Sequence, residues 1–367
     1  MSADLYKIAF SCLKGINLRL AKELLSRCGS EEAFFTATEQ QLSAINSCRN
    51  SLFSQSYRDS VMQMASCEKD FIENNHVKTL YFTDSDYPQR LLECDDAPVL
   101  LYGLGDFNLN SRHIISIVGT RHATPYGNDF VRNLIKSLSE RLEDFVIVSG
   151  LAYGIDVAAH RAALDFGVPT VGVLAHGLNT IYPAQHRNTA TAMVRSAGCG
   201  LLSDYRSQDA LHKGNFVARN RIVAGLCDCT IVVESAEKGG ALITAGIAEA
   251  YHRDVFALPG RISDRYSKGC NKLIKDNVAG LINSADDLVE AMQWHVKPVE
   301  GQQNTLQVEI SPVEESILDY LRQRGEGSIN TMCVELNIPI NKIMTLLVDM
   351  EFKNLLIPYP GGKYRPA

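Results

Sequence analysis

Several common patterns are missing from the sequence. None of the ten cysteines forms a C-x-x-C pair beside a histidine cluster, so buried reduced thiols are a simpler interpretation than a zinc site or a disulfide framework. No apolar run reaches the roughly 18 residues of a membrane span, and the N-terminus has no basic segment followed by an apolar one. We therefore expect a cytoplasmic chain without metal or membrane contact.

Motifs for nucleotide cofactors are missing as well. The sequence contains neither G-x-G-x-x-G nor G-x-x-x-x-G-K-[ST], so we expect no cofactor and no ATP hydrolysis. His176 and His186 have no serine or cysteine partner in a nucleophile motif. An excess of positive charge is also absent, since the net charge is −6. Contact with nucleic acid would therefore require a local basic groove.

The 367 residues are enough for two or three domains with their own cores. Helical spacing of apolar residues predicts a helical module over residues 1–75, broken at Lys14–Asn17. The module is SAM-like or helix-hairpin-helix-like. The usual second glycine of such a hairpin is replaced by Asn17, which favours a packing role over DNA contact.

Residues 76–295 alternate between two patterns. Near-continuous apolar strands, such as 114–118 and 145–148, alternate with amphipathic helices. This alternation predicts an α/β fold with a parallel sheet covered on both faces. The glycines that follow these strands should then share one edge of the sheet.

The last part of the chain has a different organisation. Residues 296–308 are polar and without a period, which predicts a linker. Residues 309–367 show three helices and a small β-wing, the pattern of a winged helix. Its third helix carries Asp349 and Glu351 as well as lysines. A helix that reads a DNA groove should be more basic, so a protein contact or packing is favoured.

Two segments carry the candidate chemistry. In Ile114–Asp129 a strand ends at Gly119, and a helix follows after a short turn. This arrangement places backbone N–H groups and Arg121 where an anion can bind. In 211–221, which we expect to be a loop, cations surround Phe216, and cations for phosphates with an aromatic for a base make a single-strand groove. The alternative is that the two arginines of this second segment pair with helix carboxylates and Phe216 is core.

Two further strand ends repeat this logic. Lys238 and two glycines precede a helix, and Ser149–Asp156 is similar, with Asp156 expected as a helix N-cap. Lys272 follows the last strand and is expected at the rim. The candidate DNA-binding residues are Gly119, Thr120, Arg121, Gly150, Lys213, Asn215, Phe216, Arg219, Asn220, Arg221, Lys238, Gly239, Gly240 and Lys272.

Together these segments resemble the DprA (Smf) family, the DNA-processing proteins of bacterial natural transformation. The matching pieces occur in the family's order: IVGTR (117–121), SGLAYGID (149–156), ARNRIVAGL (218–226), KGGALITA (238–245), FALPG (256–260) and GCNKLI (269–274). The sequence departs from the family at Ala218, where proline is common, and at His176–Asn179, where the family more often has Gly-x-Gly-Leu-Asp.

The resemblance implies a Rossmann-like domain that binds and protects single-stranded DNA without sequence specificity and helps load the recombinase RecA. It also implies a homodimer. Arg121 resembles the family's motif arginine, and Lys213 and Phe216 resemble its lysine and its base-stacking aromatic. An enzyme is the alternative, because nucleoside-monophosphate phosphoribohydrolases have a related sheet. Their Pro-Gly-Gly-x-Gly-Thr-x-x-Glu signature is missing here, and Glu234 is the carboxylate near that turn that could act as an acid or base.

Overall fold

The structure, a computed structural model, describes residues 4–45, 50–297, 311–353, 355–359 and 362–366. The chain divides into two compact units, Met1–Lys297 and Pro298–Ala367. Of the segment 296–308, expected to be a linker, only the first two residues are among those described.

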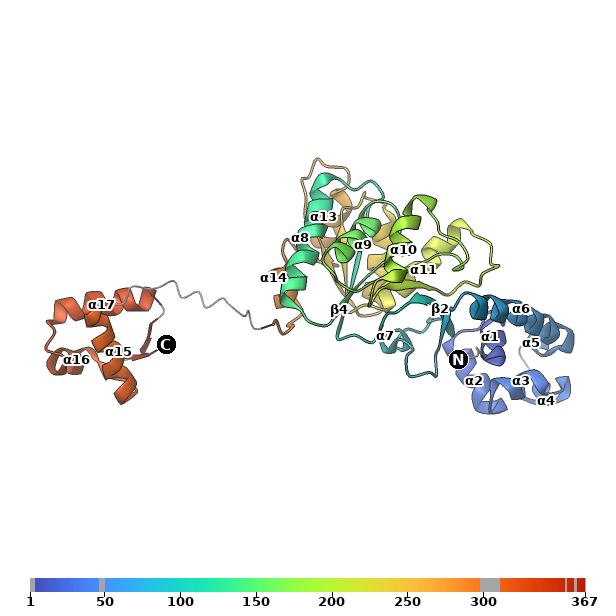
Figure 1. Cartoon of the computed structure of the whole chain (residues 1–367), viewed down its shortest axis with the longest axis horizontal. Helices are drawn as coiled ribbons and strands as arrows, with labels where there is room; N and C mark the ends of the chain where they lie inside the picture. The colour runs from blue at the N-terminus through green and yellow to red at the C-terminus, as the bar shows by residue number, and fades with distance from the viewer. Residues whose placement is uncertain (1–3, 46–49, 298–310, 354, 360–361, 367) are drawn as a thin grey trace. The chain divides into compact units, whose positions relative to one another are not determined.

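The N-terminal part of the larger unit is helical. Its described helices are α1 (Leu5–Ser11), α2 (Leu18–Cys28), α3 (Glu31–Thr36), α4 (Glu39–Ile45), α5 (Asn50–Phe53) and α6 (Gln55–Asn74). Asn17 is the N-cap of α2, and its side chain accepts a hydrogen bond from the Leu20 N–H at 2.9 Å. Helix α1 packs against α6 and against strand β2 (Leu100–Gly105), so these helices share a core with the sheet (Figure 1).

The sheet of the larger unit has nine strands among the described residues, in the order β1-β2-β6-β5-β4-β3-β7-β8-β9. Besides β2, its strands are β1 (Lys78–Tyr81), β3 (His113–Gly119), β4 (Phe145–Ser149), β5 (Thr170–Val173), β6 (Gly200–Ser203), β7 (Cys229–Val233), β8 (Asp254–Ala257) and β9 (Gly280–Leu281). Neighbouring strands from β6 to β9 run parallel. The expectation of an all-parallel sheet is wrong at one edge, because β2 pairs antiparallel with both β1 and β6.

Helices cover both faces of this sheet. On one face lie α8 (Pro125–Arg141), α9 (Ile155–Asp165) and α14 (Ala285–Ala291), with α8 and α14 side by side in Figure 1. On the other lie α11 (Lys213–Gly225), α12 (Gly240–Ala250) and α13 (Lys268–Lys275). The remaining helices are α7 (Gln89–Leu92), η1 (Ala184–His186) and α10 (Arg187–Arg195). In β3, Ile115 and Ile117 face the α8–α9 core and Ile114 the opposite core, which explains the continuous apolar run.

The chain reverses its direction across the sheet at β3. It adds β4, β5 and β6 on one side of β3, then returns to add β7, β8 and β9 on the other. Such a reversal opens a crevice above the carboxyl ends of the two strands at the switch point, here β3 and β7. The turns after Gly119 and Val233 therefore border a crevice that the backbone topology itself creates.

The smaller unit combines helices with a short antiparallel sheet in the order β10-β12-β11. Its elements are α15 (Pro312–Arg324), β10 (Gly327–Ser328), α16 (Ile329–Glu335), α17 (Ile340–Phe352), β11 (Leu356–Tyr359) and β12 (Lys363–Pro366). A capping box of Ser311 and Glu314 starts α15. Lys353 Nζ, just beyond α17, lies 2.8 Å from the Glu314 carboxylate, which ties the two helices together.

Within the described residues, no single helix is both long and apolar enough to cross a membrane; one helix pair, Ile329–Glu335 with Ile340–Glu351, reaches that length and composition together but is bent by 118°. Among these same residues, no three His, Cys, Asp or Glu side chains gather as a group that could hold a metal ion.

Candidate functional site

The turn after β3 is held in place by main-chain hydrogen bonds from both sides. The Thr120 N–H donates to the carbonyl oxygen of Glu234, after β7, at 2.7 Å. The Thr120 carbonyl accepts from the Ile155 N–H, in the first turn of α9, at 3.2 Å. A side chain at Gly119 would collide with the Val233 carbonyl, and Gly154 has φ +77° and packs against the backbone of Thr120. These two close approaches explain why both motifs carry glycine there.

Arg121 and Phe216 face each other across the crevice. The Arg121 guanidinium carbon lies 5.7 Å from the centre of the Phe216 ring, which is the range of a cation–π contact. Phe216 also has an aromatic neighbour, Tyr182, with ring centres 5.7 Å apart. Arg121 and Phe216 both border a cleft of about 690 Å³. Two segments far apart in the sequence thus form its walls, as expected from strands whose carboxyl ends share an edge.

The same cleft brings together nine of the fourteen candidate residues. These nine are Gly119, Thr120, Arg121, Gly150, Phe216, Arg219, Asn220, Gly239 and Gly240. The other five do not line it: Lys213, Asn215, Arg221, Lys238 and Lys272. Lys213, Lys238 and Lys272 are exposed, and the Asn215 side chain donates to the Ala210 carbonyl at 3.2 Å.

The segment around Phe216 is a helix rather than the loop we expected. Helix α11 begins at Lys213 and runs through Gly225. Residues three and four apart on a helix share a face, and Phe216, Arg219, Asn220 and Val223 accordingly all line the cleft. The helical period therefore decides which residues of this segment reach the site.

Arg219 lies at the floor of the cleft but its side chain is engaged by the protein. It is only 4% exposed and donates to the carbonyl oxygens of Gly150, at 2.7 Å, and Val173. Burial lowers the pKa of its guanidinium, but an arginine remains charged in a folded protein. Its donors already hold the ends of β4 and β5, which gives Arg219 a supporting position; direct contact with DNA stays a prediction.

Asp156 also supports the floor of the cleft. The N-cap of α9 is Gly154, so Asp156 is the second helical residue and our N-cap expectation is wrong by two positions. Its carboxylate accepts from the Ala152 N–H at 3.4 Å. Burial raises the pKa of Asp156, while the nearby Arg219 guanidinium and the backbone N–H groups act to lower it. Arg219 and Asp156 are thus both buried at the floor of the cleft.

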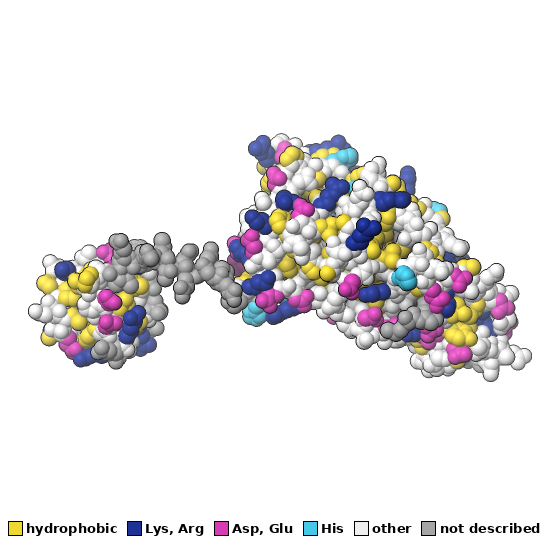
Figure 2. All heavy atoms as spheres, viewed as in Figure 1, with side chains coloured by type: hydrophobic (Ala, Val, Ile, Leu, Met, Phe, Trp, Pro, Cys, Tyr) yellow, Lys and Arg dark blue, Asp and Glu magenta, His cyan; other side chains and the backbone are white. Residues whose placement is uncertain are grey.

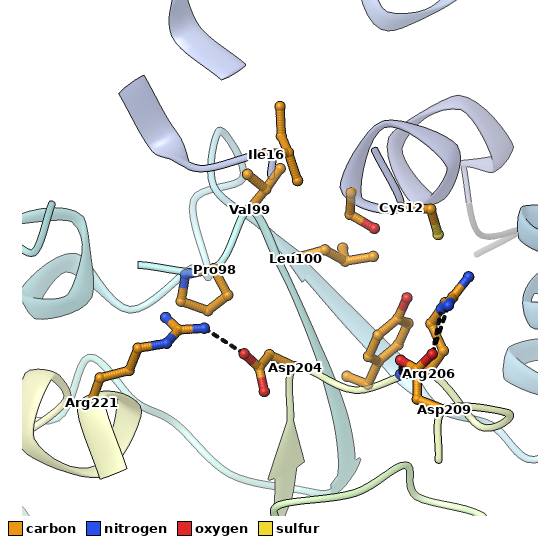
Figure 3. Close-up of a pocket in the computed structure, with 11 residues that line it drawn as sticks. Cys12, Ile16, Pro98, Val99, Leu100, Asp204, Arg206, Asp209 and Arg221 are labelled. Atoms are coloured by element: carbon orange, nitrogen blue, oxygen red, sulfur yellow. Dashed lines mark hydrogen bonds and ion pairs between the residues drawn. The ribbon is translucent and has the colours of Figure 1, made fainter. Parts of the chain in front are cut away.

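Arg221 belongs to a different hollow. Its guanidinium lies 2.5 Å from the Asp204 carboxylate and also donates to the Asp96 carbonyl. Figure 3 shows Arg221 and Asp204 pointing toward each other in a pocket of about 240 Å³ that also includes Ile16 of the N-terminal part. Arg221 therefore joins α11 to the segments at Asp96 and Asp204 and does not line the cleft; its contact with DNA stays a prediction.

Sequence reasoning missed several residues of the cleft, among them His122, Arg265 and Tyr266. The His122 and Tyr266 rings are stacked with centres 5.9 Å apart, and the Arg265 guanidinium lies 5.7 Å from the Tyr266 ring centre. Nothing in the local pattern of residues 261–267 marks it as part of the site. It reaches the cleft because the Ser235 N–H donates to the Tyr266 carbonyl at 2.5 Å.

Glu234 occupies the position that the enzyme alternative singled out. It has φ +58°, in the left-handed region, and is 5% exposed. One carboxylate oxygen accepts from the Thr124 N–H at 2.9 Å and the other from the Thr124 hydroxyl. Thr124 is the N-cap of α8, so Glu234 places a carboxylate at a helix N-terminus. This engagement of both oxygens is that of a structural acceptor.

Charge is unevenly distributed over the larger unit despite the net charge of −6. On the face shown in Figure 2, Lys and Arg side chains predominate over the upper part of the sheet region, while Asp and Glu gather toward the N-terminal helices. A local excess of cations can attract a polyanion even when the whole chain is acidic.

Comparison with known proteins matches the region that builds the cleft. A family model described as DNA recombination-mediator protein A matches residues 78–293. DNA processing protein DprA of Streptococcus pneumoniae is 40% identical over 211 residues, covering 58% of this chain and 73% of that protein. Protein Smf of Escherichia coli K12 is 31% identical over 283 residues, covering 76% of this chain and 75% of that protein.

Two solved structures share the fold. The X-ray structure of DprA from S. pneumoniae has a TM-score of 0.65 and 33% identity, covering 79% of this chain and 98% of that one. DNA processing protein A from Helicobacter pylori has a TM-score of 0.53 and 30% identity, covering 60% of this chain and 97% of that one. The latter structure is described for its single-stranded DNA binding mode.

Fold and cleft together define a mixed α/β protein whose candidate site is the crevice at the switch point of a largely parallel sheet. The chain belongs to the family of DNA recombination-mediator protein A, the DprA and Smf proteins. The resemblance inferred from the motifs is thereby confirmed.

Proposed function

We propose that the chain binds and protects single-stranded DNA without sequence specificity and helps load RecA onto it during recombination and natural transformation. The observation that carries the proposal is the Arg121 guanidinium held 5.7 Å from the Phe216 ring inside one cleft. A cation for the phosphate and an aromatic face for the base are what a single strand requires. The H. pylori relative, described by its single-stranded DNA binding mode, supports the same assignment.

Helix α12 supplies a second anchor for the backbone. Its N-cap is Gly239, no side chain caps it, and Gly239 and Gly240 both line the cleft. The free N–H groups and the positive end of the helix dipole favour a phosphate at that point. A strand would thus lie with one phosphate near Arg121, another near Gly240, and a base on Phe216. None of these contacts reads a base edge, which accounts for sequence tolerance.

The proposal is tested by a gel-shift series that compares single-stranded and double-stranded DNA at two salt concentrations. Binding should favour the single strand and fall steeply with added salt, since phosphate contacts release counterions. Equal binding of both forms at both salt concentrations would contradict it. RecA filament formation on coated single strands, measured with and without the chain, tests the loading step.

We predict that Phe216→Ala weakens single-strand binding while leaving the salt dependence unchanged. A base stacked on an aromatic ring contributes about 1–3 kcal/mol, and that contact releases no counterions. The measurement is fluorescence anisotropy with labelled oligo-dT over a salt series. Phe216→Tyr keeps an aromatic face and should retain most of the affinity. A change in the salt slope with unchanged affinity would show that Phe216 is not a stacking platform.

We also propose that the chain acts without catalysis. Because Thr124 engages both oxygens of Glu234, Glu234→Gln should lower the free energy of unfolding by about 1–2 kcal/mol through loss of a charged acceptor. Neither the wild type nor the variant should release a base from AMP or CMP. Base release by the wild type that is lost in Glu234→Gln would establish the enzyme alternative instead.

We propose that the sheet is Rossmann-like, that the N-terminal helices form a SAM-like or helix-hairpin-helix-like packing module, and that the smaller unit is a winged helix that contacts protein. Ile340, Met344 and Val348, four residues apart along α17, are 54%, 52% and 47% exposed. A helix that reads a DNA groove presents polar and basic side chains to the bases, not an apolar stripe.

RecA and a second copy of the chain are the partners that we propose. We place these interactions in the cytoplasm, where both proteins and DNA meet.

A further inference from the structure

A second hollow, of about 840 Å³, adjoins the cleft. We call it the shelf and define it by Tyr126, Pro259, Arg261, Arg265 and Tyr266, all of which line it. Arg265 and Tyr266 line both the shelf and the cleft, so the two hollows meet along these side chains. A polymer that fills the cleft therefore has a continuous path onto the shelf.

The shelf carries two anchored aromatic rings. Tyr126 is 52% exposed, and its hydroxyl donates to the Pro259 carbonyl at 2.9 Å, which fixes the ring at the start of α8. Tyr266 is held through its own carbonyl by the Ser235 N–H and through its ring by the stack with His122. Fixed rings offer stacking surface at little cost in side-chain entropy.

The shelf also carries cations that the protein leaves available. Arg261 and Arg265 are exposed, and within the described part of the chain neither forms an ion pair. Two carboxylates line the same hollow, Glu234 and Asp264. The first is buried and engaged by Thr124, so Asp264 is the exposed acid set against two exposed arginines. Aromatic rings with available arginines repeat the chemistry of the Arg121 and Phe216 pair.

We propose that the shelf binds the next nucleotides of the same single strand whose first part occupies the cleft. Bases would stack on Tyr126 and Tyr266, and phosphates would contact Arg261 and Arg265. The inference rests on the proposed function, because it extends the strand from a cleft that already holds it. It assigns the strand a path over the protein surface, from Phe216, past Tyr266, to Tyr126 at the start of α8.

The test is a length series of oligo-dT from about 4 to about 16 nucleotides, the range of site sizes for single-strand grooves. Affinity of the full-length wild type should rise in two stages, first as the cleft fills and then as the shelf fills. In Tyr126→Ala and in Arg261→Ala the second stage should be lost, lowering affinity for the long oligonucleotides about five- to hundred-fold while the short ones bind as before. Tyr126→Phe keeps the ring and should retain the second stage.

Arg121→Ala and Arg112→Ala complete the design. Arg121→Ala should weaken binding at every length, because it acts in the cleft. Arg112 is exposed and precedes β3, at the opposite edge of the sheet, so Arg112→Ala should bind like the wild type at every length.

The outcomes separate the inference from the function beneath it. If Arg121→Ala loses affinity but both shelf variants follow the wild type at all lengths, the shelf inference is wrong and the cleft assignment stands. If Arg121→Ala binds like the wild type at all lengths, the proposed function itself is wrong. If the shelf variants lose affinity equally at every length, the shelf is part of one undivided site and the two-stage path is wrong. A thermal melt of each variant excludes loss of fold as the cause.

Discussion

Arg121→Ala is expected to lower the affinity for oligo-dT about ten- to hundred-fold. The guanidinium is exposed at the mouth of the cleft and lies over the Phe216 ring, so its removal takes away a phosphate contact and weakens the support of the stacking base. A hydrogen bond to a charged group contributes about 1.5–3 kcal/mol, which corresponds to that loss. The slope of log affinity against log salt should also become shallower by about 0.7, the value for one phosphate of a single strand.

The measurement is fluorescence anisotropy at several salt concentrations, with Arg121→Lys as the matched variant. Lysine keeps the charge but loses the planar fork, so it should recover the salt slope and only part of the affinity. An Arg121→Ala protein that binds as tightly as the wild type, with the same slope, would remove Arg121 from the site.

Arg219→Ala is expected to act on the fold. Truncation leaves the carbonyls of Gly150 and Val173 without their donor and the buried Asp156 carboxylate without its neighbouring charge. Leaving a buried carbonyl oxygen without its donor costs about 1–3 kcal/mol for each group, and a domain is stable by only about 5–15 kcal/mol. The measurement is urea unfolding, in which the midpoint should fall while the slope stays constant.

Arg195→Ala is the matched control, because Arg195 is exposed in the last turn of α10. Its unfolding free energy should stay within about 0.5 kcal/mol of the wild type. If Arg219→Ala unfolds like the wild type but loses DNA affinity, then Arg219 contacts the ligand directly and the supporting role assigned to it is wrong.

The convergence of Arg121 and Phe216 could be predicted from the sequence because parallel strands bring their carboxyl ends to one edge. The roles of Arg219 and Arg221 could not. Three cations around one aromatic residue indicate a basic segment but do not show which of them reach the cleft. Because the segment is a helix, Arg219 lines the cleft while Arg221, two positions further on, lies on another face. Residues 211–221 show no clear amphipathic face. The sequence therefore provided no reason to separate the cations, and all of them were assigned to one groove.

The contribution of Arg265 and Tyr266 was out of reach for a different reason. Their place in the cleft depends on the main-chain hydrogen bond between Ser235 and Tyr266. Because every residue type can form such a bond, the sequence does not reveal it. The antiparallel pairing of β2 with β1 and β6 is a similar case, since the apolar residues of β2 fit either direction of pairing.

Three of the hydrogen bonds that shape the cleft join peptide groups: Thr120 to Glu234, Ile155 to Thr120, and Ser235 to Tyr266. Peptide groups do not titrate, and they need no side chain to be ordered before a ligand arrives. The empty and occupied forms should therefore have nearly the same outline, with little disorder left to lose on association. A cleft of such fixed shape can bind successive segments of a long polymer one after another. The protein does not need to refold between one segment and the next.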